Sequence, residues 1–284
     1  MKPKFIRLDK LITDRKLVES RTLAQEYIES GRVSVENTIV TKPASMVSPE
    51  ASIKIDTPEK QWVSRGAHKL LKAIDFFGIS PKDRVCIDIG ASTGGFTDVL
   101  LSSGAAKVYA VDVGYGQLAW KLRTDERVVV MERTNARFLT GEMFPDGKAD
   151  IIVSDASFIS LKLLLNPLEP LLKDEGLMSV LVKPQFEVGK ERVGKGVVSD
   201  PSLHKDVLNE LSDFIDKETN LKLLDATFSP IRGPEGNIEF LFLLGHKNIQ
   251  CKSAKIIDME TLVSEAHRVT ASATEESRMT PNAK

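Results

Sequence analysis

The chain has very little cysteine. Cys86 and Cys251 are the only two among 284 residues, and Cys86 lies in an apolar run typical of a buried strand. Two cysteines without a pattern cannot form a disulfide framework or a thiolate metal cluster, so we expect a reducing, cytoplasmic setting. The four histidines also lack metal-ligand spacing. We therefore expect no metal site.

Long apolar runs are scarce as well. A transmembrane helix needs about 18 consecutive apolar residues, whereas the longest run here, Ile238–Leu244, is interrupted by Glu239. The polar N-terminus does not resemble a secretory signal. The net charge of −1 gives no overall sign of a nucleic-acid partner, so any such case depends on local features. We expect a soluble protein without a membrane partner.

Residues 1–60 are predicted to form a small α+β domain. Leu8, Leu11 and Ile12 recur at helical spacing and predict a short helix. Ser20 is a typical helix N-cap and Gly31 a typical stop, so a second helix is expected between them. Short alternating segments then predict strands.

The rest of the chain is predicted to form one larger domain. Residues 61–64 are the expected linker, and residues 65–250 alternate strand and helix patterns. This alternation predicts an α/β fold with a doubly wound, Rossmann-like sheet whose early strands are parallel. The turn at 233–237 predicts an antiparallel C-terminal hairpin. Residues 251–284 are polar and are expected to be a partly disordered tail.

A glycine-rich loop follows the first strand of the larger domain. The run Asp88-Ile-Gly-Ala-Ser-Thr-Gly-Gly-Phe-Thr97 leads from a strand into a helix, where backbone can approach a ligand. Asp112 ends the next strand and suits the acidic partner of a ribose. An acidic residue entering the loop favours a cationic ligand, S-adenosylmethionine, over a dinucleotide. The alternative is a tight turn without a ligand. The predicted donor-binding residues are Asp88, Gly90, Ala91, Ser92, Gly94, Gly95, Phe96, Asp112, Val113 and Asp155.

Four charged residues are candidates for catalysis. Asp155 and Lys183 each end a buried strand, at the sheet edge where open parallel sheets bind ligands. Glu239 interrupts an apolar strand, where a carboxylate does not serve packing. Lys69 lies on the helix before the sheet and taken alone could face solvent, and Asp155 with Lys183 could be a structural ion pair. A basic group beside a ribose hydroxyl would orient or deprotonate this poor nucleophile.

These motifs resemble the TlyA family of FtsJ-type ribose methyltransferases, long known as haemolysins. The similarity runs in order over residues 5–247, through Ser64-Arg-Gly-Ala-His-Lys69, Asp88–Thr97, Ser154-Asp155-Ala-Ser-Phe-Ile, Lys183-Pro-Gln-Phe-Glu-Val-Gly and Gly236-Asn-Ile-Glu239. The resemblance implies 2′-O-methylation of cytidine in ribosomal RNA, with S-adenosylmethionine as donor and ribosomal subunits as partners. It also implies a catalytic set made of Lys69, Asp155, Lys183 and Glu239. FtsJ itself has Ala-Pro-Gly-Gly where this chain has Ser92-Thr-Gly-Gly, which moves the expected substrate away from uridine.

The N-terminal domain resembles the αL-type RNA-binding domain of ribosomal proteins and pseudouridine synthases. Residues 1–62 hold eleven Lys and Arg against nine Asp and Glu, a net of +2, which most often marks a solvated face. The loop at 184–200 carries three basic residues among glycines and is predicted to clamp the RNA backbone. The predicted RNA-binding residues are Arg7, Lys10, Arg21, Arg32, Arg65, His68, Lys190, Arg192 and Lys195.

Three other functions remain open from the sequence. A pore-forming haemolysin would need an apolar span or a long amphipathic β pattern. An RNA-binding protein without catalysis would not need the intact set of Lys69, Asp155, Lys183 and Glu239. A methyltransferase for small molecules or proteins would leave the N-terminal domain without a purpose. The oligomeric state and the modified nucleotide are not indicated by the sequence.

Overall fold

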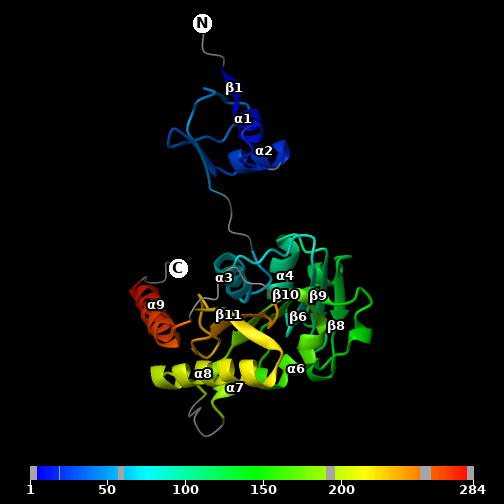
Figure 1. Cartoon of the computed structure of the whole chain (residues 1–284). Coiled ribbons are helices and arrows are strands. Elements are labelled where there is room, and N and C mark those ends of the chain that lie inside the picture. The colour runs from blue at the N-terminus through cyan, green and yellow to red at the C-terminus, as the bar shows by residue number, and fades with distance from the viewer. Residues whose placement is uncertain (1–4, 19, 57–60, 190–195, 250–256, 280–284) are drawn as a thin grey trace. The chain divides into compact units, whose positions relative to one another are not determined.

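The computed structural model describes residues 5–18, 20–56, 61–189, 196–249 and 257–279. The chain divides into two compact units, Met1–Gln61 and Trp62–Lys284 (Figure 1).

The N-terminal unit combines two helices with short antiparallel strands. Helices α1 (Leu8–Asp14) and α2 (Arg21–Glu29) form as predicted, and the Ser20 hydroxyl caps α2 by accepting from the amide of Leu23 at 3.2 Å. Their apolar stripes and two buried strand residues, Val33 and Val47, contribute to a small core. The strands are β1 (Ile6–Arg7) paired with β4 (Met46–Val47), and β2 (Val33–Val35) between β3 (Thr38–Ile39) and β5 (Ile53–Ile55).

The larger unit is built on a seven-stranded sheet in the order β11-β12-β10-β9-β6-β7-β8. Neighbours from β10 to β8 are parallel, and β12 runs antiparallel to both β10 and β11. The predicted α/β fold and its antiparallel final strands are therefore confirmed. The strands are β6 (Val85–Ile89), β7 (Lys107–Val111), β8 (Val128–Met131), β9 (Ala149–Ser154), β10 (Leu172–Val182), β11 (Leu221–Phe228) and β12 (Phe240–His246).

Helices cover both faces of this sheet because successive residues of the buried strands point to opposite sides. Cys86 packs in one apolar cluster and Ile87 in the other. The first cluster includes residues of α3 (Ala67–Phe77), α4 (Gly95–Ser102) and α5 (Trp120–Arg123). The second includes residues of α6 (Leu165–Leu168), α8 (Pro201–Glu218) and α9 (Met259–Met279). Short pieces complete the unit: α7 (Pro184–Glu187) and the 3₁₀ turns Ala136–Phe138, Gly141–Met143, Leu161–Leu163 and Glu169–Leu171.

Helix α9 corrects the expectation of a partly disordered tail after residue 250. Met259, Leu262, Val263 and Ala266 recur at helical spacing and are buried in the core. The polar residues between them concealed this stripe in the sequence. None of the described helices combines the length and apolar character needed to cross a membrane.

The chain order creates a switch point beside β6. From β6 the chain proceeds to β7 and β8 on one side, and later to β9 and β10 on the other. The connections leaving β6 and β9 therefore diverge, and a crevice opens between them at the carboxyl edge of the sheet. Gly90 and Asp155 are the first residues after these two strands.

Candidate active site

The glycine-rich loop owes its position to Gly90 and Gly94. Both have positive φ angles, +80° and +99°. A Cβ atom at Gly90 would lie 3.0 Å from the backbone of Ala156, so only glycine lets the loop approach the end of β9 this closely. A Cβ atom at Gly94 would overlap the Leu122 side chain. With glycine at both positions, the loop packs closely against the end of β9 and against Leu122 of α5.

Gly95 couples the same loop to the start of α3. A Cβ atom there would overlap the Ser64 hydroxyl and come within 3.1 Å of the Ala67 amide nitrogen. The first turn of α3 therefore packs directly on the loop, and this turn carries Lys69. The close packing explains how a helix residue reaches the crevice.

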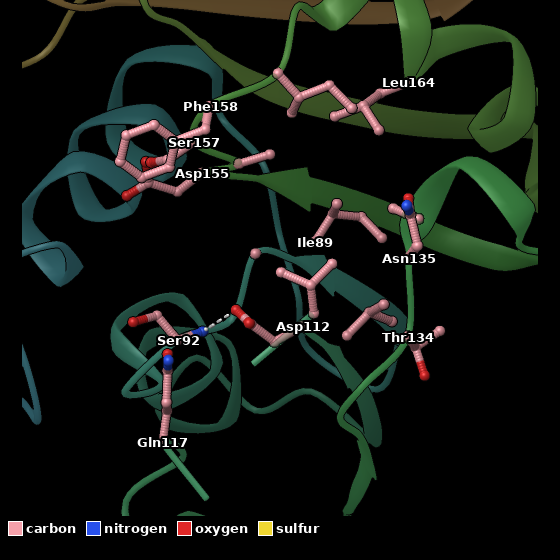
Figure 2. A pocket seen from close by; sticks show the side chains of 16 residues that line it. Ile89, Ser92, Asp112, Gln117, Thr134, Asn135, Asp155, Ser157, Phe158 and Leu164 are labelled. Carbon is pink, nitrogen blue, oxygen red and sulfur yellow. Dashed lines mark hydrogen bonds between the residues drawn. The ribbon is translucent and has the colours of Figure 1, made fainter. Parts of the chain in front are cut away.

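A cavity of about 330 Å³ opens beside the loop (Figure 2). Asp112 lies in its wall, and its carboxylate accepts from the amides of Ser92 at 2.8 Å and Gly114 at 2.6 Å. Figure 2 shows Asp112 beside Ser92, with the Asp155 side chain on another part of the wall. The lining also includes Gly90, Val113, Gln117, Thr134, Asn135 and Phe158.

The predicted donor-binding residues are not all in this lining. Ala91, Gly95 and Phe96 instead line a second cavity that shares Gly90, Ser92 and Asp155 with the first. Asp88 lies beneath the loop and is fully buried. Its Oδ2 accepts from the Thr97 hydroxyl at 2.7 Å, whereas its Oδ1 has no hydrogen-bond partner in the described structure. Burial raises the pKa of Asp88 to about 7, which favours the neutral form.

The four candidate catalytic residues meet in one line of alternating charge. Lys183 Nζ lies 2.6 Å from Asp155 Oδ1, and Lys69 Nζ lies 3.3 Å from Asp155 Oδ2. Lys69 Nζ is also 2.7 Å from Glu239 Oε2. Both lysines are 6% exposed and Glu239 is 1% exposed. Each buried ammonium therefore has a carboxylate beside it, which offsets the cost of burying charge.

Four different elements deliver these residues to one edge of the sheet. Lys69 comes from α3, Asp155 and Lys183 follow β9 and β10, and Glu239 precedes β12. Because β12 is antiparallel, its beginning lies where the parallel strands end. Burial raises the pKa of Glu239, and the neighbouring charge of Lys69 opposes the rise.

Lys183 is held by more than its ion pair. Its Nζ donates to the Ser157 hydroxyl at 2.6 Å and to the backbone carbonyl of Asp155 at 3.2 Å. Three oxygens thus fix the direction of the amine. Ser157 was not predicted, although it stands two residues after Asp155. Gln117, Thr134, Asn135 and Phe158 were also missed, since a single polar or aromatic residue in a loop does not reveal that its side chain faces a cavity.

Two cavities besides the one at Asp112 are lined by Lys183. The second cavity, of about 270 Å³, is lined by Lys69, Lys183 and Arg65. A third, of about 290 Å³, is lined by Lys183, Glu239 and the segments around Gly196 and Pro234. Lys183, Ser157 and Pro234 border both. A polar acceptor entering here would meet both amines, next to the cavity beside Asp112.

The predicted RNA-binding residues fall into three groups. In the larger unit, Arg65 and His68 are exposed beside the lysines. In the N-terminal unit, Arg32 is half-buried, and Lys10 pairs with Asp14 at 2.7 Å. Arg7 and Arg21 both bind the buried carboxylate of Asp9, at 2.9 and 3.0 Å. The loop residues Lys190, Arg192 and Lys195 lie outside the described residues.

Metal ligands do not cluster in the part of the chain that the structure describes. No group of three or more His, Cys, Asp or Glu side chains there could hold an ion. The absence of a metal from the function stays a prediction.

Comparisons with known proteins show the family of the chain. The family model described as FtsJ-like methyltransferase matches residues 62–246, and the S4 domain model matches residues 6–53. The chain is 45% identical to a Bacillus subtilis protein named rRNA methyltransferase YqxC, over 94% of this chain and 96% of the relative. It is 46% identical to the 16S/23S rRNA (cytidine-2′-O)-methyltransferase TlyA of Mycobacterium tuberculosis, over 88% and 93%. A solved structure of a Streptococcus thermophilus protein described as a hemolysin superposes with a TM-score of 0.72 at 39% identity, covering 96% of this chain and 99% of that one.

Proposed function

This chain belongs to the FtsJ-like methyltransferase family, and from that premise we propose that it transfers a methyl group from S-adenosylmethionine to the ribose 2′-hydroxyl of cytidine in ribosomal RNA. The observation that carries the proposal is the buried Lys183–Asp155–Lys69–Glu239 line at the mouth of two cavities. The M. tuberculosis relative bears the name of this activity.

The cavity beside Asp112 fits the donor. Asp112 presents a carboxylate in the wall, where a ribose of the donor would bind, and the loop around Gly90 brings backbone to the same space. The buried Oδ1 of Asp88 beneath the loop adds an acceptor without a partner in the described structure. Bound S-adenosylmethionine supplies an electrophilic methyl group on a positively charged sulfur.

The side chains at the lysines act on the acceptor hydroxyl. Lys183, directed by Asp155 and Ser157, is placed to orient a ribose hydroxyl in the second cavity and, in its neutral amine form, to receive the hydroxyl proton during the attack; Asp155 then pairs with the ammonium that results. Lys69 adds a positive charge beside the oxygen that becomes negative, and Glu239 holds Lys69 in place. Because these groups are fixed before the acceptor enters, little reorganisation accompanies the reaction.

The N-terminal unit supplies RNA affinity in this proposal. Arg7 and Arg21 are about half exposed although both bind Asp9, so their guanidinium groups also face solvent and a phosphate backbone. In the larger unit, Arg65 lines the second cavity and the exposed His68 directly precedes Lys69. Ribosomal subunits in the cytoplasm are the proposed substrates.

The test measures transfer from labelled S-adenosylmethionine to small subunits, large subunits and naked ribosomal RNA. Wild type should place the label on one ribose, which makes the adjacent phosphodiester stable to alkali. Lys183→Ala should lower the rate by about 10²–10⁴-fold with donor affinity unchanged, because the proton acceptor is lost. Lys121→Ala, which removes an exposed lysine paired with Asp98, is the control and should keep its rate. Label on a base or protein, or none in RNA despite donor binding, contradicts the proposal.

A further inference from the structure

The turn at residues 233–237 forms part of the wall of the cavities at the lysines. It precedes β12, and a Cβ atom at Gly233 would lie 2.7 Å from Glu239 Oε1, so the turn packs directly on that carboxylate. Pro234 lines both cavities at the lysines. A small displacement of the turn would therefore move Glu239 and reshape the space for the acceptor.

Arg232 ties this turn to the C-terminal helix α9. One guanidinium nitrogen, Nη1, donates to the backbone carbonyl of Gly236 at 2.9 Å and closes the turn. The other, Nη2, donates to the Thr270 hydroxyl on α9 at 3.0 Å. Thr270 is 6% exposed and its hydroxyl donates to the Ala266 carbonyl at 2.7 Å, which directs its lone pairs toward Arg232. The helix thus fixes Arg232, and Arg232 fixes the turn.

Asn237 ties the turn to a second segment of the wall. Its side-chain oxygen accepts from the Val198 amide at 2.9 Å, and its side-chain nitrogen donates to the Gly196 carbonyl at 3.0 Å. Gly196 lines the third cavity together with Lys183. Asn237 is buried, so losing either bond would leave a polar group without a partner in the protein interior, which is unfavourable.

A pair of histidines anchors that second segment to helices α8 and α9. His204 of α8 is fully buried, with Nε2 at 3.1 Å from the Val198 carbonyl and Nδ1 at 2.9 Å from Nε2 of His267 on α9. A carbonyl can only accept, so His204 Nε2 carries the proton and its Nδ1 accepts from His267. This pattern needs a neutral ring. Burial, together with the neighbouring His267, lowers the pKa of His204 to about 4 and so favours that form.

We propose that helix α9 positions the acceptor side of the active site, with Thr270 acting through Arg232 and His267 acting through His204. These are positioning residues, since they reach the turn and the segment around Val198 rather than the acceptor. The inference rests on the proposed methyl transfer for its catalytic consequence, whereas the mechanical link stands on the hydrogen bonds alone. Loosening either bridge leaves the donor cavity beside Asp112 intact and displaces Glu239.

The first experiment compares Thr270→Val with Thr270→Ser in the full-length protein. Valine keeps the shape but removes the acceptor for Arg232, and serine restores the hydroxyl. Hydrogen exchange in the segment 229–240 should be about tenfold faster in T270V than in wild type. The rate of transfer to ribosomal RNA should fall about fivefold at unchanged S-adenosylmethionine affinity. Both values should return close to wild type in T270S.

A second variant tests the same bridge from its other end. Arg232→Gln also loses the bond to the Gly236 carbonyl, so its exchange and rate should change at least as much as those of T270V. The double variant should be no worse than R232Q alone, because Thr270 acts on the turn only through Arg232. Glu260→Gln is the matched control, since it breaks an exposed ion pair between α9 and Lys205 of α8 and leaves the bonds of Arg232 in place. It should leave both measurements at wild-type values.

The outcomes separate the two claims. Wild-type exchange in T270V, or additive effects of T270V and R232Q, would overturn the link between α9 and the turn. Faster exchange with a wild-type transfer rate would overturn the positioning role, as would an equal loss of donor affinity. If wild type itself does not methylate ribosomal RNA, the proposed function fails while the exchange data still decide the link.

Discussion

Each unit of the molecule contains a carboxylate shared by two cations, but the two arrangements are inverted. In the N-terminal unit, Asp9 is fully buried and its partners Arg7 and Arg21 are 44% and 52% exposed. In the larger unit, the side chain of Asp155 is 20% exposed and the side chains of its partners Lys69 and Lys183 are each 7% exposed. One site turns its cations toward solvent, and the other turns them into cavities.

The two units also differ in the type of cation, which is arginine at Asp9 and lysine at Asp155. Arginine keeps its charge and offers a planar fork, so Arg7 and Arg21 can hold Asp9 and still face an anionic partner. Lysine presents a compact amine that can exchange a proton, which suits a buried position beside a reacting hydroxyl. In the function proposed above, two cations thus serve RNA binding in one unit and two serve the chemistry in the other.

Removing the shared carboxylate of the larger unit should have the largest effect. Asp155→Asn leaves Lys183 without its anionic partner and frees the direction of its amine. We expect transfer to fall about 10³-fold with the protein folded, measured as kcat on ribosomal subunits.

Asp150→Asn is the matched control for this variant. Asp150 also holds two cations, Arg84 and Lys173, but it stands at the start of β9 rather than after its end. It should cost stability and leave kcat near wild type. Equal losses of kcat in both variants would show that the ion pairs act through stability alone.

Removing the shared carboxylate of the N-terminal unit should affect stability instead. Hydrogen bonds from Arg7, and then from Gln25 and Arg21, hold the pKa of Asp9 well below its usual range. Its charged form is thus favoured by folding, and the stabilisation is present above about pH 4 and lost as the pH falls further. At pH 7, Asp9→Asn should lower the free energy of unfolding of this unit by about 2 kcal/mol.

Hydrogen exchange of the α1 and α2 amides measures this loss, which should shrink below pH 4. Asp14→Asn, which removes an exposed partner of Lys10 in the same helix, should change stability by no more than about 0.5 kcal/mol. A difference between D9N and wild type that does not vary with pH would contradict the assignment.

A third carboxylate, Asp88, sharpens the comparison because it accepts a hydrogen bond from the Thr97 hydroxyl rather than from a cation. Burial raises its pKa to about 7, so the folded state keeps a proton that the unfolded chain releases near pH 4. Stability should therefore decrease as pH rises through this window, by about 1 kcal/mol between pH 6 and pH 7. For Asp88→Asn, the free energy of unfolding in urea, monitored by tryptophan fluorescence, should not show that decrease with pH. If the free energy of unfolding of wild type and of Asp88→Asn changed equally between pH 6 and pH 7, the prediction would be wrong.

Much of the fold was predictable because its signals are local. Alternating apolar strands and helices indicated the doubly wound sheet, and the turn at 233–237 indicated the final antiparallel strands. The insertion of β12 between β10 and β11 was not predictable, since strand order depends on contacts distant in sequence. Helix α9 was missed because its apolar stripe is narrow and its other positions are polar.

The candidate site divides in the same way. Lys183 and Asp155 stood out because each ends an apolar strand, and Glu239 stood out because it interrupts an apolar run, where a carboxylate does not serve packing. Ser157 and Asn237 gave no such signal, since short polar residues in loops are common and only their burial and partners distinguish them. The depth of Asp88 beneath the loop was likewise hidden, because sequence does not reveal which side of a turn faces the cavity.

The late position of β12 has a consequence for synthesis of the chain. Glu239 stands just before this strand, which enters the sheet between β10 and β11, both of them made earlier. On the ribosome, the RNA-binding unit and most of the sheet emerge while the edge of β10 is still unpaired. A nascent chain can thus acquire affinity for RNA before its four charged residues are assembled. The catalyst is completed only when its last strand closes the sheet.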